Sequence, residues 1–93
     1  MRLVNSKRIE AIKKAIVDVS GKSMIELETS RKHTVTSWAT LGMYLMTKEG
    51  ETAESAAKHY GRKQGIVYRK IKEIEDKLDD YQPVIDKILE RVE

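Results

Sequence analysis

The fold of this chain is decided by the stretch Tyr60-Gly61-Arg62-Lys63-Gln64-Gly65-Ile66-Val67-Tyr68-Arg69-Lys70-Ile71-Lys72. From residue 58 to residue 72 there are six Lys or Arg and no acid, whereas residues 73–93 hold eight acids against three bases. A basic block that begins at a glycine turn and precedes an acidic stretch is typical of a helix-turn-helix that presents its second helix to DNA. We therefore expect the acidic remainder to face away from the phosphates.

The spacing of small and apolar residues around this turn fits the same motif. Ala57 allows two helices to cross closely, Gly61 can adopt a positive φ, and Val67 can anchor the second helix on the first. The helix-turn-helix is predicted to span about residues 52–72.

The free face of its second helix supplies the candidate DNA contacts. Gln64 suits adenine, and either Lys63 or Arg62 could reach guanine, while Gly65 would let the helix lie close to the groove. The candidate phosphate contacts are Lys32, Lys58, Arg62, Arg69, Lys70 and Lys72. Because a phosphate contact is independent of sequence, loss of Arg69 or Lys70 should weaken binding to every duplex, whereas loss of Gln64 should change the preference among duplexes.

The rest of the chain is predicted to be helical, with no segment that alternates as a strand would. The expected helices are, from the N-terminus, 6–20 (capped by Asn5 or Ser6), 24–28 (with a capping box from Ser23 to Glu26), 36–49, 53–60 (capped by Thr52), 62–80 and a last one from Pro83. Residues 29–34 are polar and basic, and we expect an exposed loop there. Because proline disrupts a helix interior, we expect a break near residues 81–82.

Apolar residues at helical spacing predict the core. The third helix should bury Trp38, Leu41, Leu45 and Met46, with Met43 and Tyr44 at the margins. The other inward positions are expected to be Ile9, Ile12, Ile16, Val19, either Ile66 or Val67, Ile71, Ile74 and Leu78.

Length and composition predict one all-α domain, residues 1–93, with five to six helices. The net charge is +3, but residues 1–48 carry nine bases and four acids, and residues 49–93 nine bases and eleven acids. Without cysteine, and with His33 and His59 far apart, we expect no metal site, cofactor or nucleophilic centre, and so no enzyme and no small-molecule substrate. We see neither a signal peptide nor a membrane-spanning run and expect a cytoplasmic protein.

The tail carries a second pattern. Apolar residues alternate spacings of three and four from Ile71 to Val92, which is a coiled-coil period broken by Pro83. One interpretation is that the tail (about residues 81–93) packs on the chain's own core. The alternative is a protein-interaction module, in which residues 71–92 form a homodimer seam or bind a replication protein.

Two segments resemble the C-terminal DNA-binding domain of the DnaA replication initiator family. Thr40-Leu41-Gly42-Met43-Tyr44-Leu45 resembles that family's A-M-Y-L helix, and residues 61–67 lie where the family has G-R-D-H-T-T-V. The resemblance covers about residues 9–80. It implies a Trp-repressor-like fold, duplex DNA as the partner, and a role in replication initiation or transcription regulation. No Walker motif is present, so we expect a free-standing domain, such as a phage or mobile element encodes, or a domain excised from a longer protein.

The resemblance also implies a second DNA contact. Arg31 falls on a loop arginine that enters the minor groove, so that Arg31, Lys32, His33 and Thr34 would all touch DNA. Residues 63–65 fall on the family's base-reading triplet Asp-His-Thr and differ from it at all three positions. Lys-Gln-Gly cannot form the hydrogen bonds of Asp-His-Thr, and we expect it to read a different sequence or to select less strictly.

Overall fold

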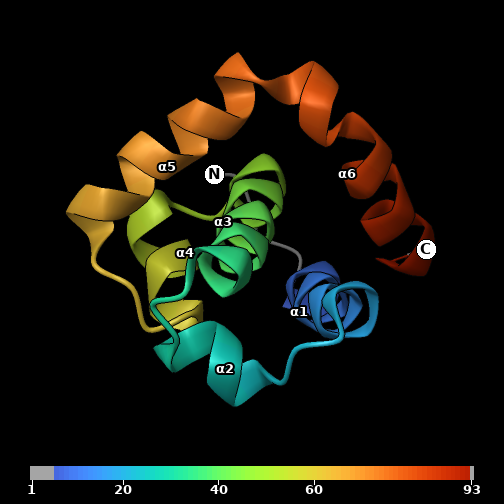
Figure 1. Ribbon diagram of the computed structural model, residues 1–93, viewed down its shortest axis with the longest axis horizontal. Helices are drawn as coiled ribbons and strands as arrows, with labels where there is room; N and C mark the ends of the chain where they lie inside the picture. Colours follow the sequence, from blue (N-terminus) through green and yellow to red (C-terminus); the bar gives the residue numbers. More distant parts are fainter. Residues whose placement is uncertain (1–5, 93) are drawn as a thin grey trace.

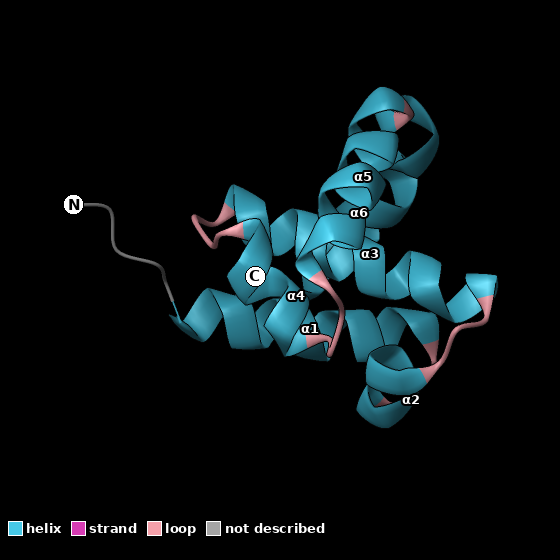
Figure 2. Cartoon of the chain, turned by 90° about the vertical axis from the view of Figure 1, so that its left-hand side faces the viewer, coloured by secondary structure: helices cyan, strands magenta, loops and turns pink. Residues whose placement is uncertain are grey.

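Six helices make up most of the computed structural model, which describes residues 6–92 (Figure 1). Short connections join them, and no strand occurs in this part of the chain (Figure 2), as an all-α protein requires. The helices are α1 (Ser6–Ser20), α2 (Met24–Thr29), α3 (His33–Lys48), α4 (Ala53–His59), α5 (Gln64–Asp76) and α6 (Leu78–Val92). None of these six is long and apolar enough to cross a membrane. The expected cap Asn5 lies outside the described residues.

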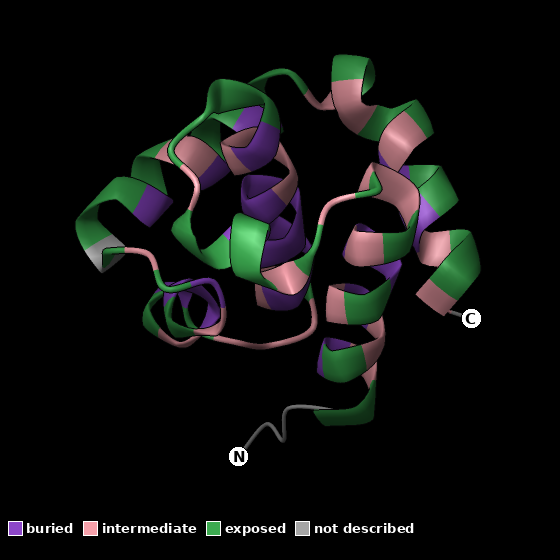
Figure 3. Ribbon diagram, turned by 60° about the horizontal axis from the view of Figure 1, so that its bottom comes forward, coloured by how far each residue is buried: buried purple, intermediate pink, exposed green. Residues whose placement is uncertain are grey.

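Helix α3 runs through the centre, and the other helices surround it (Figure 1). Every residue from Ala39 to Met46 is buried, and Figure 3 shows the buried residues gathered on the inward faces. The prediction that Met43 and Tyr44 lie at the margins is wrong, since they are 2% and 6% exposed. A central helix is covered on several sides, so its buried surface is wider than one apolar stripe. Trp38, expected in the core, packs against it only partly buried.

The tail completes the same core. α6 packs along α1, so that the first and last helices of the chain lie side by side (Figure 1). Ile85 and Ile88 are 4% and 0% exposed, and Leu78, Tyr81 and Val92 pack against the core in partly buried positions. The heptad residues therefore fill the interior of a single chain.

The long helix predicted for residues 62–80 is two helices. The break lies at Lys77, which has φ −118° and ψ 33°, and not near residues 81–82. Pro83 lies inside α6. It is the sixth residue of that helix and has no N–H to donate to the carbonyl four residues earlier, so one carbonyl of the first turn lacks its helical hydrogen bond. The bend at Lys77 lets α6 turn back onto α1.

Helices α4 and α5 are joined by a tight turn at Gly61. Thr52 caps α4 as predicted, with its side chain accepting a hydrogen bond from the Ser55 N–H at 3.0 Å. Gly61 has φ +60°, its N–H donates to the Lys58 carbonyl, and the Arg62 N–H donates to the Ala57 carbonyl. This is a Schellman ending. A side chain at residue 61 would be strained and would come within 3.2 Å of the Glu28 carbonyl oxygen.

Tyr60 fixes this turn to the central helix. Its side chain is fully buried, and its ring packs on the backbone of α3 at Gly42, where no Cβ intervenes. The Tyr60 hydroxyl has no hydrogen-bond partner among the described residues. Burial, and secondarily the negative charge of Glu28, raise the pKa of Tyr60 well above its ordinary value. The turn between α4 and α5 is thus anchored from inside the core.

Candidate nucleic-acid interface

A groove of about 500 Å³ separates the start of α5 from the connection between α2 and α3. Segments about thirty residues apart in sequence form its two sides. Its lining residues are Glu28, Thr29, Arg31, His33, Thr36, Thr40, Met43, Gly61, Arg62, Lys63, Ile66, Val67 and Lys70. Four of them are Lys or Arg and one is an acid, so the groove carries a net positive charge.

Arg62 ties the two sides of the groove together. Its Nη2 donates to the carbonyl of Leu27 near the end of α2 at 2.5 Å, and its buried Nε has no partner among the described residues. Burial lowers the pKa of Arg62, and the positive charge of Arg31 lowers it further. Two guanidinium groups therefore lie close enough to repel each other, and a bound anion would relieve that repulsion. The predicted phosphate contact Arg62 also has a structural role.

The other cations of the groove lack acidic partners. In residues 6–92, no ion pair involves Arg31, Lys63 or Lys70. Arg31 and Lys63 are exposed and Lys70 is partly buried. By contrast Lys58, a predicted phosphate contact on α4, lies 3.8 Å from the Glu54 carboxylate and is absent from the groove lining.

The predicted loop at residues 29–34 is shorter than expected. Thr29 ends α2, and His33 and Thr34 form the first turn of α3. The expectation failed because Val35, which is 3% exposed, anchors the start of α3 in the core. Only residues 30–32 connect the two helices, and Arg31 is exposed in that connection.

Two helices begin beside the groove without a side-chain cap. The N-cap residues are Lys32 for α3 and Lys63 for α5, and neither side chain bonds to its helix. Helices α2 and α4 have the side-chain caps that the sequence predicted, from Ser23 and Thr52. Residues at both helix starts, His33 and Lys63, line the groove, and the dipole at a helix start favours negative charge.

Helix α5 has an inner and an outer face. Val67 is fully buried, with Ile71 and Ile74 on the same face, which answers the alternative between Ile66 and Val67. Ile66 is 50% exposed, and Tyr68 is 61% exposed. Neither Ile66 nor Tyr68 was predicted to contact DNA. The sequence did carry one signal, because Ile66 and Val67 are adjacent and only one of the two can face the core.

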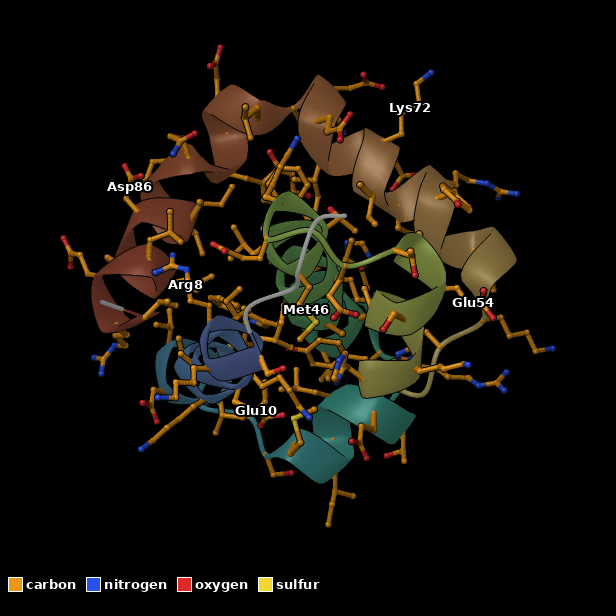
Figure 4. All side chains as sticks on the ribbon, turned by 180° about the vertical axis from the view of Figure 1, so that it is seen from behind. Arg8, Glu10, Met46, Glu54, Lys72 and Asp86 are labelled. Carbon is orange, nitrogen blue, oxygen red and sulfur yellow. The ribbon has the colours of Figure 1, made fainter. Side chains whose placement is uncertain are left out.

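Three further predicted contacts on α5, Gly65, Arg69 and Lys72, do not line the groove. Arg69 and Lys72 are exposed, and Lys72 points away from the body of the molecule (Figure 4). Gly65 is exposed, and Gln64 is the first residue of α5. Over the described residues, no group of three His, Cys, Asp or Glu is placed to hold a metal ion.

Comparisons of the chain with family models, with curated proteins and with solved structures find no match.

Proposed function

We propose that this chain binds double-stranded DNA through a helix-turn-helix formed by α4 and α5, with α5 as the helix that enters the major groove. The observation that carries the proposal is the convergence of Arg31, Arg62, Lys63 and Lys70 around one groove, with Arg31, Lys63 and Lys70 lacking ion pairs in residues 6–92. A site with free cations and little opposing charge favours a polyanion.

The geometry of α4 and α5 supports the same function. The buried Ala57 and Val67 hold the helices together, and Gly61 sets the turn. Because α5 fixes its inner face on the core, its outer face is free to read base edges. The uncapped starts of α3 and α5 offer backbone N–H groups to phosphates that pass the groove.

The resemblance to the DnaA family suggests how the two sides of the groove divide the duplex. We propose that Arg31 enters the minor groove while α5 occupies the adjacent major groove, and that the phosphate backbone between them passes the cationic groove. Because residues 63–65 differ from the family's triplet, the preferred sequence would differ from a DnaA box. The process would be replication initiation or transcription regulation, and no enzymatic activity is proposed.

Fluorescence anisotropy tests this function directly. The labelled probes are a DnaA-box duplex, a scrambled duplex and a random-sequence pool, each at a low and a high salt concentration. We expect binding that weakens as salt rises, because phosphate contacts release counterions. Preference for the box would favour an initiator-like role, and equal binding of the three probes would direct the search to selection from the pool. Absence of binding at low salt would reject the function.

The structure gives less support to the alternative of a protein-interaction tail. The heptad residues Ile85 and Ile88 are buried against the chain's own core, so a seam that used them would have to open the fold. Association through other parts of residues 71–92 stays a hypothesis that sedimentation of the intact chain would test.

A further inference from the structure

Gly65 is a glycine that the fold does not require. It lies in the first turn of α5, its φ is outside the left-handed region, and a Cβ at this position would meet nothing within 4 Å. Gly42 and Gly61, in contrast, are required by the Tyr60 ring and by a φ of +60°. Glycine loses more backbone entropy than alanine when it enters a helix. A helical glycine at a position where a Cβ would meet no other atom therefore needs an explanation other than packing.

Arg69 lies one helical turn after Gly65. At about 100° per residue, these two residues occupy the face of α5 opposite Val67, Ile71 and Ile74. A helical side chain leans toward the N-terminus, so the surface that Arg69 covers lies over the turn that contains Gly65. The missing side chain leaves that surface bare along the middle of the exposed face.

The Arg69 guanidinium is free to use this space. The side chain is exposed and makes no ion pair within residues 6–92, although Glu73 lies four residues further along the helix. The flanks of α5 carry other cations, with Lys70 on the side that lines the groove. When a helix enters the major groove, its flanks face the phosphate walls and its outer face meets the base edges.

We infer that Arg69, extended over Gly65, reads a guanine in the major groove. The planar guanidinium can donate two hydrogen bonds to guanine O6 and N7, and a side chain at residue 65 would hold it away from the bases. This inference rests on the proposed DNA-binding function. It gives Arg69 a different role from the phosphate contact that its charge alone predicts.

The test uses duplexes that the unmodified protein selects from a random pool. Each guanine is then replaced in turn by 7-deazaguanine, which lacks the N7 acceptor, and affinity is measured by anisotropy. At one guanine the replacement should weaken binding of the unmodified protein by about tenfold or more. The Arg69→Ala variant should be insensitive to that replacement. Arg69→Lys should keep the salt dependence and weaken the preference, because a lysine ammonium lacks the planar fork of a guanidinium.

Lys70→Ala is the matched control, since it removes a cation from the groove side of the same helix. It should weaken binding to all duplexes alike and leave the guanine preference intact. The inference is overturned if Arg69→Ala keeps the full preference, or if the unmodified protein binds duplexes without selecting any sequence. In both of those cases DNA binding itself stands, whereas absence of duplex binding would remove the proposed function as well.

Discussion

Two glycines on neighbouring helices show how differently one residue type can act. At Gly42 an added Cβ would overlap the Tyr60 hydroxyl oxygen and come within 2.8 and 2.9 Å of two ring carbons, whereas at Gly65 it would meet nothing. The ring of Tyr60 is fully buried and cannot move aside without disturbing the core. The same substitution should therefore have opposite effects at the two sites.

We predict that Gly42→Ala lowers the free energy of unfolding by about 1–3 kcal/mol, because an added group in a packed core forces its neighbours to shift. Gly65→Ala should raise it by about 0.5–1 kcal/mol, because the unfolded chain loses conformational freedom. Urea unfolding of the two variants measures both values. Destabilisation by Gly65→Ala would show that the fold does need this glycine and would remove one premise of the role given to Arg69.

Tyr60 should make the fold sensitive to alkali. Its pKa is raised in the folded state by burial and by Glu28, while in the unfolded chain the phenol ionises near its ordinary pKa of about 10. Above that pH the unfolded state binds fewer protons than the folded state, so stability falls as pH rises, by at most about 1.4 kcal/mol per pH unit. Below about pH 9 this contribution is constant.

The Tyr60→Phe variant tests this contribution. It removes the ionisable group together with a buried hydroxyl that has no partner among the described residues, so its stability near pH 8 should equal or exceed that of the unmodified protein. Urea unfolding at about pH 8 and pH 10.5 should show the difference widening in favour of Tyr60→Phe. A difference that stays constant across this range would contradict the account.

At the scale of the helix, the starts of α3 and α5 lack the caps that α2 and α4 possess. Lysine at an N-cap forgoes the hydrogen bond that Ser, Thr, Asp or Asn would accept, which is worth about 1 kcal/mol. Both lysines stand beside the groove, where their charge serves the proposed function. A capping residue in place of either lysine should therefore stabilise the helix and weaken binding to DNA.

Lys63→Asn should stabilise the fold by about 1 kcal/mol, because asparagine can accept a hydrogen bond from the first turn of α5. The same change should weaken binding to duplex DNA, since it removes a free cation from the groove. Urea unfolding and anisotropy give the two quantities. Lys87→Asn, on the exposed face of α6, removes a charge without supplying a cap and should leave DNA binding unchanged. Equal loss of binding in both variants would indicate that only net charge matters.

The two side-chain-capped helix starts and the turn at Gly61 are the features that the sequence predicted best. The capping box at Ser23, the cap at Thr52 and the turn at Gly61 depend on residues within a few positions of each other, and the structure confirms all three. The break at Lys77 was missed because no local signal marks it. The break allows α6 to pack on α1. Pro83, six residues later, directed the prediction to the wrong position.

At the scale of the whole molecule, the fold brings together cations that the sequence separates. The basic block at residues 58–72 was visible as a run of charge, but the approach of Arg31 to Arg62 depends on how α2 and α3 pack against α5. Only the resemblance to the DnaA family pointed to Arg31. Lys58 differs from the free cations because Glu54 lies four residues before it on the same helix, a spacing that the sequence already shows.

The chain also carries exposed cations away from the groove. The groove lies where α2, α3 and the start of α5 meet, while α6 and α1 lie on the other side of the central helix (Figure 1). Lys14 on α1 and Lys87 on α6 are exposed, so they offer cations of the same kind far from the groove. A double variant at each end changes the net charge of the protein equally.

The most direct measurement is the slope of log affinity against log salt for duplex DNA. It is compared between two double variants: the first carries Arg31→Gln and Lys63→Gln in the groove, and the second carries Lys14→Gln and Lys87→Gln away from it. Because Arg31 and Lys63 stand beside the phosphate backbone that the groove would hold, the first double variant should bind more weakly and its slope should be shallower than that of the unmodified protein. The second should keep the slope of the unmodified protein. Equal weakening in the two double variants would contradict a DNA site at the groove and indicate binding that follows net charge alone.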